Sequence, residues 1–181
     1  RSIYKTPAQL RAMIAPGLIT ADALQAVRAM IAPGVTTGEL DAEAERVIRA
    51  AGAEPNFMLV KGYHHTVCAS VNEQVVHGRP GDIVSIDAGA QFAGWNGDSA
   101  LTVVIPDASR PEVVAERERL SEVTHGSLWA GIARLATASH LGEVGAAIQE
   151  HIESQGTYGI LRDYVGHGIG RKMHEPPTVF N

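Results

Sequence analysis

Apolar residues recur at helical spacing in two runs within the first 52 residues. The first run begins at Thr6-Pro7, where the threonine can cap a helix and the proline can occupy its first turn. Pro33-Gly34 predicts the end of this helix, and Pro16-Gly17 predicts a kink or a split inside it. Its apolar positions are Leu10, Met13, Ile14, Leu18, Leu24, Val27, Met30 and Ile31.

Three further helices are predicted by the same spacing and by signals at their ends. Thr36 and Glu39 form a capping box at the start of the second helix, which we expect to end at Gly52. A third helix is predicted over residues 112–136. We expect the fourth to be capped by Ser139 and to stop at Gly156.

Apolar and β-branched runs between and after these helices predict strands. Residues 56–60 and 66–71 have this composition, and Asn72-Glu73 marks a turn after them. Residues 160–165 are the last predicted strand. The strongest signal is a β-hairpin over residues 83–104, whose two apolar arms are separated by a glycine-rich stretch.

The hairpin brings two carboxylates together. If the reversal centres on Phe92-Ala93, the numbers of paired residues sum to 185, and Asp87 lies directly opposite Asp98. Like charges in directly opposed positions destabilise a strand pair. Either one carboxylate is protonated or a cation lies between them, and oxygen ligands suit divalent metals. The alternative is a different register in which one aspartate is a solvated turn residue.

Two helical segments are similar to each other. TGELDAEAERVIRAAGA at residues 37–53 aligns with LGEVGAAIQEHIESQGT at residues 141–157, and a predicted strand follows each. We interpret this as a duplicated helix-and-strand unit, although any two capped amphipathic helices share part of the pattern. Two such halves facing each other would leave a cleft, which is a common place for a site.

Composition excludes several classes of protein. The net charge is −5 and the basic residues form no cluster, so nucleic acid is not an expected partner. The single cysteine cannot make an intramolecular disulfide, which fits a reducing compartment. No apolar run approaches the roughly 18 residues needed to span a bilayer, and no signal peptide is apparent. We therefore expect a soluble cytoplasmic protein.

Three of the eight histidines stand beside glycines or close to prolines and glycines: His77, His167 and His174. A lone histidine is more often structural than a ligand. Three of them, together with the two aspartates, favour a metal site. GHGIG at residues 166–170 superficially resembles a phosphate loop, but neither a following helix nor a Walker lysine supports that interpretation.

Tyr63, Cys68 and Met173 are candidates for the wall of a small apolar pocket, and plain core packing is the alternative. Cys68 could also be a nucleophile beside a histidine. A single cysteine within a strand such as TVCASV is more often a small wall or core residue.

Three stretches together resemble the type I methionine aminopeptidases. They are VNEQVVHG at residues 71–78, the aspartates Asp87 and Asp98, and GHGIGRKMHE at residues 166–175. The resemblance runs from the first helix to the last residue. It implies an α+β pita-bread fold, in which two pseudo-symmetric halves with antiparallel sheets and flanking helices surround two metal ions. The halves would be residues 1–106 and the start of a second half at about residues 111–181, in one catalytic domain.

The resemblance also implies roles for individual residues. Asp87 would chelate one divalent ion, Asp98 would bridge both, and His167 would bind the other; Co²⁺, Mn²⁺, Fe²⁺ and Zn²⁺ are the expected metals. These ions would activate a water molecule and polarise the scissile carbonyl. His174 would stabilise the oxygen of the tetrahedral intermediate, and His77 would bind substrate near the new amine. Tyr63, Cys68 and Met173 match the neighbourhood of the methionine pocket.

The chain departs from the family pattern in two places. The family uses two further glutamate ligands, and no residue up to Asn181 matches them; Glu175 matches neither. We expect both in roughly the last quarter of the family's domain. The loop between Gly78 and Asp82 is also shorter than is usual in the family.

The resulting prediction is a metal-dependent peptidase that removes the N-terminal methionine of nascent proteins. Its partner is a peptide N-terminus; a monomeric state and action near the ribosome are further expectations. The alternatives are an Xaa-Pro dipeptidase or aminopeptidase of the same fold, and a non-catalytic binding module that kept the fold.

Overall fold

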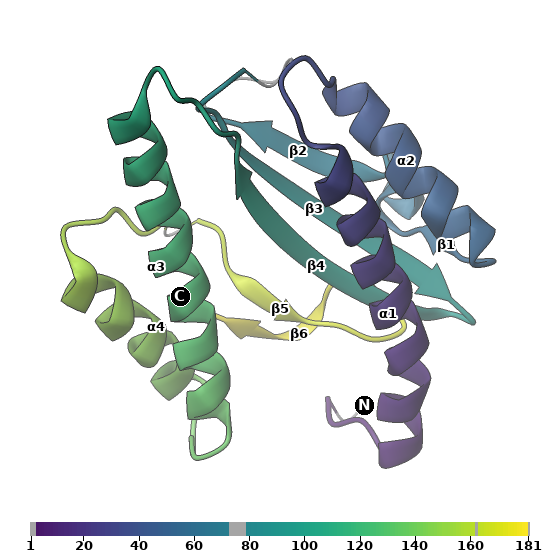
Figure 1. The fold of residues 1–181 in the computed structure, drawn as a ribbon. Helices are drawn as coiled ribbons and strands as arrows, with labels where there is room; N and C mark the ends of the chain where they lie inside the picture. The colour runs from purple at the N-terminus through teal and green to yellow at the C-terminus, as the bar shows by residue number, and fades with distance from the viewer. Residues whose placement is uncertain (1–2, 73–78, 162, 181) are drawn as a thin grey trace.

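The computed structural model describes residues 3–72, 79–161 and 163–180, and its α+β class confirms the prediction (Figure 1). In chain order the elements are α1 (Pro7–Met30), α2 (Thr37–Ala50), β1 (Glu54–Pro55), the 3₁₀ turn η1 (Phe57–Leu59), β2 (Val67–Val71), β3 (Ile83–Phe92), β4 (Trp95–Val104), α3 (Pro111–Leu135), α4 (Gly142–Gln155), β5 (Gly166–Gly168) and β6 (Glu175–Val179).

Strand β3 is the centre of the first sheet. Strand β4 pairs with it along its whole length, while β1 and β2 pair with successive parts of it. Because β4 occupies one edge of β3 throughout, β1 and β2 share the other edge. All these pairings are antiparallel. The predicted hairpin over residues 83–104 is therefore confirmed, and β2 lies at an edge of the sheet.

Helix α1 crosses the sheet as one continuous helix (Figure 1), so Pro16 does not split it. The Thr20 hydroxyl donates to the Pro16 carbonyl at 2.9 Å and accepts from the Ala90 N–H at 3.1 Å. Proline deprives the carbonyl four residues earlier of its partner. That residue, Ala12, is exposed, so water can take the place of the missing donor.

The main hydrophobic core lies between this sheet and the first two helices. Leu24 and Val27 of α1, Leu40 of α2 and Val84 and Ile86 of β3 are buried in it. Both helices begin at the predicted capping boxes, Thr6 with Gln9 and Thr36 with Glu39. Capping satisfies main-chain donors that would otherwise lack a partner.

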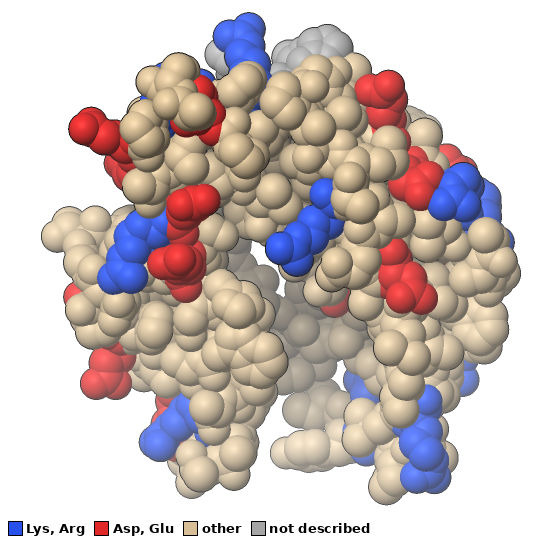
Figure 2. All heavy atoms as spheres, viewed as in Figure 1, with Lys and Arg blue, Asp and Glu red and all other residues tan. Residues whose placement is uncertain are grey.

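The second part of the chain contributes α3, α4 and a two-stranded antiparallel sheet of β5 and β6. Helices α2 and α4, which carry the two similar sequences, each have 14 residues. Among the described residues, every helix is too short or too polar to span a membrane. Figure 2 shows a hollow between the α3–α4 layer and α1, with charges of both signs scattered over this face.

Three predicted details are wrong. Residues 57–59 form a 3₁₀ turn instead of a strand, because the Leu59 and Val60 N–H groups donate to carbonyls three residues earlier. Short apolar runs do not distinguish these conformations. Of residues 160–165, those that are described form no strand, since β5 starts at Gly166.

Ser139 is likewise not the cap of α4. The helix starts at Gly142, and the Glu143 carboxylate accepts the main-chain N–H groups of Ser139 and His140 at 3.0 and 3.1 Å. The N-cap residue is Leu141, which makes no side-chain capping hydrogen bond, and Ser139 lies outside the helix.

Helix α1 packs closely against β4 at Gly97. A Cβ atom at Gly97 would stand 2.5 Å from the Pro16 carbonyl oxygen and 2.7 Å from the Gly17 nitrogen, both of which are main-chain atoms. The contact therefore requires a residue without a side chain immediately before Asp98.

We predict that Gly97→Ala lowers the free energy of unfolding by about 1–3 kcal/mol, because the helix must move away from the sheet. Gly38→Ala is the matched control. Its Cβ would meet only the Thr36 Oγ1 at 3.9 Å, and alanine favours a helix, so stability should stay within about 1 kcal/mol or rise. Urea denaturation measures both variants, and equal effects would contradict the role given to Gly97.

Candidate metal centre

The two aspartates lie on one face of the hairpin, but they are not directly opposed. Asp87 pairs with Ala100, and Asp98 pairs with Gly89, so the paired numbers sum to 187 instead of the predicted 185. The two side chains are diagonal neighbours, a spacing that long side chains still span. The predicted register is wrong by two residues, yet both carboxylates still point to the same side, because side chains alternate with a period of two.

The turn explains the shift in register. Ala93 and Gly94 alone connect β3 and β4, and both have positive φ, 51° and 73°. This pattern is a type I′ turn, which suits the twist of a two-residue hairpin. An alanine at positive φ is uncommon, so the sequence does not mark the turn at that position.

Beside Asp98 the hairpin carries a buried polar cluster. A Cβ at Gly89 would stand 2.3 Å from Asn56 Oδ1, so the absence of a side chain there makes room for Asn56. Asn56 Nδ2 donates to the Gly97 carbonyl at 3.2 Å and to Asn96 Oδ1 at 3.4 Å. Asn96 in turn donates to the Gly170 carbonyl from its main chain and its side chain, both at 3.0 Å. The cluster therefore joins β4 to the segment between β5 and β6.

Arg171 completes this junction. Its Nη1 donates to the carbonyls of Ala93 and Gly94 at 3.1 and 3.0 Å, and its guanidinium lies 4.0 Å from the centroid of the Trp95 ring. A planar guanidinium can make both contacts at once. The turn of the hairpin is thereby fixed to the loop that precedes His174.

This junction brings His167 and His174 to the aspartates. His167 Nε2 lies 3.5 Å from Asp98 Oδ2, and the two imidazole rings have centroids 4.3 Å apart. His167 Nδ1 is 3.0 Å from the Gly168 carbonyl oxygen, which can only accept, so Nδ1 carries the proton. Its Nε2 is then free to bind a cation near Asp98, an orientation typical of metal-binding histidines.

Both aspartates bind protons more tightly than usual. Burial, followed by the charge of Asp98, raises the pKa of Asp87 to about 6. Burial is also the largest cause of the raised pKa of Asp98, and the neighbouring histidines oppose it. Two partly buried carboxylates beside each other and beside a free imidazole nitrogen form a set that a divalent cation would stabilise.

A pocket of about 250 Å³ opens at these groups. Its lining residues are Phe57, Val60, Tyr63, Cys68, Asp87, Asp98, His167, Met173 and His174. All of the site residues predicted from the sequence line it except His77, which lies outside the described residues. The cysteine is exposed, and burial, followed by the adjacent Cys68, raises the pKa of Tyr63 to about 12.

Sequence reasoning missed Phe57, Val60, Asn96 and Arg171. The first two were assigned to a strand, although their position just before Tyr63 was a usable signal. Asn96 and Arg171 act through main-chain contacts that are distant in sequence, and no pattern marks such contacts.

The donor set fits a divalent metal in its chemistry, although it is partial. Among the described residues, no group of three or more His, Cys, Asp or Glu side chains could hold a metal ion as it stands. Asp87, Asp98 and His167 nevertheless line one pocket, and the resemblance implies additional carboxylate ligands. Glu175 is not such a ligand here, because it binds Lys5 Nζ at 3.0 Å and the Lys172 N–H at 2.9 Å.

Known proteins are similar to this chain in sequence and in fold. Residues 11–181 match metallopeptidase family M24. Methionine aminopeptidase 1 of Mycobacterium tuberculosis (strain CDC 1551 / Oshkosh) is 42% identical over 190 residues, which cover 98% of this chain and 70% of that protein.

Solved structures of related proteins have a similar fold. A crystal structure of methionine aminopeptidase from Thermotoga maritima matches with a TM-score of 0.84 and 36% identity, covering 98% of this chain and 72% of that one. Prolidase from Pyrococcus furiosus matches with a TM-score of 0.76 at 22% identity, covering 98% and 52%. The second likeness concerns the fold alone. The predicted pita-bread fold is confirmed by these matches.

The carboxylate pair makes a prediction about the protein stripped of metal by a chelator. Because the pKa of Asp87 is raised from 3.8 to about 6, the folded state holds this proton more tightly than the unfolded chain. The associated stability is present below about pH 4 and is lost as the pH rises through 6. Asp87→Asn should therefore stabilise the metal-free protein at pH 7.5 by about 1–2 kcal/mol, allowing for solvent screening.

The gain should shrink as the pH falls to 4, which urea denaturation across this range can measure. Asp107→Asn is the control with the opposite sign. The hydrogen bonds from Ser109 and Arg110 lower the pKa of Asp107 to about 2, so its replacement should destabilise the protein at pH 7.5. A metal-free Asp87→Asn variant no more stable than the parent at pH 7.5 would contradict the electrostatic account.

Proposed function

Because the chain belongs to metallopeptidase family M24, we propose that it removes the N-terminal methionine from polypeptides in a reaction that depends on divalent metal. The observation that carries the proposal is the meeting of Asp87, Asp98 and His167 in one pocket whose other walls are largely apolar. The donors suit a cation, and the apolar walls suit the side chain of methionine.

In this proposal Asp87 and Asp98 hold two divalent ions from the hairpin, and His167 binds through Nε2 from the other part of the chain. Co²⁺, Mn²⁺, Fe²⁺ or Zn²⁺ are the proposed ions. When bound, such ions supply Lewis-acid polarisation of a carbonyl and a nucleophile at neutral pH. The chain's own residues orient the donors: the Gly168 carbonyl fixes the His167 ring, and Arg171 fixes the loop that carries the second histidine.

His174 is the proposed donor to the oxygen that becomes negatively charged as the carbonyl is attacked. It lies against His167 and lines the same pocket, so it can reach a group bound there. His77 remains the proposed contact to the substrate near the new amine, which is the amine of the shortened polypeptide.

The pocket walls account for a preference for methionine. Phe57, Val60, Tyr63 and Met173 surround the site beside Cys68. Phe57 and Tyr63 meet edge to face, with ring centroids 6.1 Å apart, and sulfur interacts favourably with aromatic rings. The Tyr63 hydroxyl donates to the Val67 carbonyl at 2.9 Å, which holds the ring at the wall.

Other parts of the proposal rest on sequence. They are the single catalytic domain with halves divided between residues 106 and 111, a monomeric state, a cytoplasmic location and action near the ribosome. The substrate class is a peptide N-terminus.

We predict that full-length protein loaded with Co²⁺, Mn²⁺ or Fe²⁺ cleaves Met-Ala peptides and that Asp98→Ala abolishes this activity. Loss of a carboxylate between the other donors removes metal as well as catalysis, so metal content measured on the same sample should fall. Asp22→Ala removes an exposed carboxylate from α1 and serves as the control. Retained activity in Asp98→Ala would refute the assignment.

Substrate choice separates this function from that of an Xaa-Pro peptidase. The full-length protein should release methionine from Met-Ala-Ser and leave Ala-Pro bonds intact. Comparing kcat/KM for the two substrate classes decides between them, and a preference for Xaa-Pro bonds would favour the alternative.

A further inference from the structure

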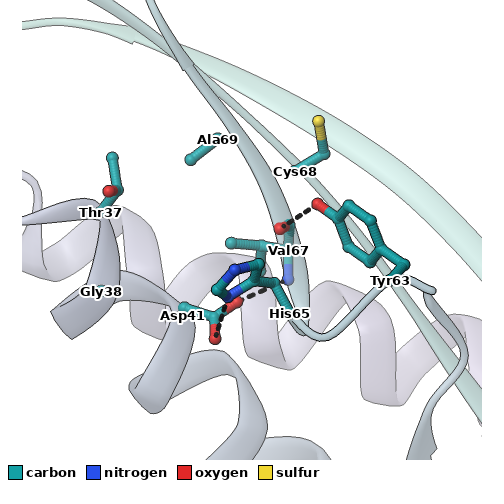
Figure 3. Close-up of a pocket in the computed structure, with 8 residues that line it drawn as sticks. All are labelled: Thr37, Gly38, Asp41, Tyr63, His65, Val67, Cys68 and Ala69. Atoms are coloured by element: carbon teal, nitrogen blue, oxygen red, sulfur yellow. Dashed lines mark hydrogen bonds and ion pairs between the residues drawn. The ribbon is translucent and has the colours of Figure 1, made fainter. Parts of the chain in front are cut away.

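A second pocket, of about 290 Å³, lies along the edge strand β2 (Figure 3). Its lining comes from the first turns of α2, from the loop before β2 and from β2 itself: Thr37, Gly38, Asp41, Tyr63, His65, Val67, Cys68 and Ala69. Tyr63 and Cys68 also line the candidate metal centre. The two pockets are therefore neighbours with a shared wall, and we call the second one the β2 groove.

The main chain of β2 is capped by side chains at its first residue. The Val67 N–H donates to Asp41 Oδ1 at 2.9 Å, and the Val67 carbonyl accepts from the Tyr63 hydroxyl (Figure 3). Both of these groups point away from β3. Asn72 has the opposite orientation, because its N–H donates to the Ile83 carbonyl on β3 at 3.1 Å.

Alternation along the strand then fixes the orientation of Ala69. Main-chain groups of alternate residues face the same side of an antiparallel strand. Ala69, two residues after Val67, therefore directs its N–H and carbonyl outward, into the groove between β2 and Thr37 of α2. In the described part of the chain, no side chain hydrogen-bonds to the main chain of Ala69 as Asp41 and Tyr63 do to Val67.

An exposed strand edge beside a helix can bind an extended peptide by strand addition. The groove does not suit an anion, because the Asp41 carboxylate lies within it and already accepts the Thr66 and Val67 N–H groups at 2.7 and 2.9 Å. Ala69 contributes one main-chain donor and one main-chain acceptor to it, beside the polar side chains of Thr37 and His65. This is the pattern that the main chain of another extended segment complements.

The proposed reaction supplies such a segment. When the N-terminal methionine occupies the metal-side pocket, the rest of the polypeptide must leave past its walls. Tyr63 and Cys68 form the wall that this pocket shares with the β2 groove. A chain leaving over them reaches the outward groups of Ala69 directly.

We propose that the β2 groove binds the downstream main chain of the substrate polypeptide, beyond its second residue, as a strand added to β2 at Ala69. The inference rests on the proposed function, whose substrate it extends. Binding through main-chain groups is independent of side-chain identity, so the groove would accept polypeptides of many sequences. Asp41 and Tyr63 cap Val67 and leave Ala69 as the open position.

The test compares Met-Ala-amide with a longer peptide, Met-Ala-Ser-Ala-Ser-amide, on metal-loaded full-length protein. The longer substrate should have the higher kcat/KM. Ala69→Pro removes the outward N–H, and proline is tolerated at such edge positions. It should reduce the advantage of the longer peptide about three- to ten-fold, which is the effect of one main-chain hydrogen bond. Ala69→Ser keeps the N–H and should keep the advantage.

A second variant and a modified substrate distinguish loss of binding in the groove from a folding defect. Thr37→Trp fills the groove from α2 without altering β2, and it should reduce the same ratio. N-methylation of the longer peptide, placed in turn at its third, fourth and fifth residues, should weaken cleavage at one position in the parent protein. Methylation at that position should have no effect on cleavage by Thr37→Trp.

The outcomes separate the two proposals. No cleavage of either peptide by the parent protein would overturn the proposed function. Cleavage of both peptides with equal kcat/KM would overturn the groove and leave the function standing. Equal losses on both peptides in Ala69→Pro and Thr37→Trp would also overturn the groove, because they would reflect general damage.

Discussion

The attachment of residues 170 and 171 to the turn of the β3–β4 hairpin is the interaction on which the site depends. The aspartates belong to the hairpin, whereas His167 and His174 come from the segment around β5 and β6. Asn96 binds the Gly170 carbonyl, and Arg171 binds the turn and covers Trp95. Gly94 suits this contact, because a Cβ there would stand 2.7 Å from the Arg171 guanidinium. Without this attachment nothing in the first sheet would hold an imidazole 3.5 Å from Asp98.

The charges of the two aspartates destabilise the same arrangement. Burial raises the pKa of both Asp87 and Asp98, and the charge of Asp98 raises that of Asp87 further, so without a bound cation the ionised pair destabilises the fold at neutral pH. The surrounding structure compensates for this cost. The full-length β3–β4 pairing, the buried core under it and the contact of α1 at Gly97 keep the strands in register. The site is thus built on the longest strand pairing of the described residues, and a bound cation would offset its unfavourable charges.

Local signals in the sequence predicted much of this arrangement. Thr6-Pro7, the Thr36–Glu39 box and the glycine-rich hairpin marked their elements, and the alternation of side chains placed Asp87 and Asp98 on one face despite an error of two in the register. The errors have physical causes. Ala93 at positive φ shifted the turn, and the apolar run before Tyr63 formed a 3₁₀ turn. Ser139 lies before the fourth helix, where its main-chain N–H donates to the Glu143 carboxylate. The role of Arg171 could not be predicted, because its partners are main-chain carbonyls 77 and 78 residues away.

The two pockets divide recognition between side chain and main chain. An apolar pocket beside charged ligands can select one side chain, because it excludes polar groups that would lose their hydration. A strand edge selects only an extended conformation. An enzyme that must accept polypeptides differing after their first residues needs strict selection at the first position and tolerance beyond it. Tyr63 belongs to both surfaces, since its ring lines the metal-side pocket while its hydroxyl caps the Val67 carbonyl at the strand edge. A change at this residue would therefore disturb both kinds of recognition, whereas Ala69 and Thr37 affect the downstream chain alone.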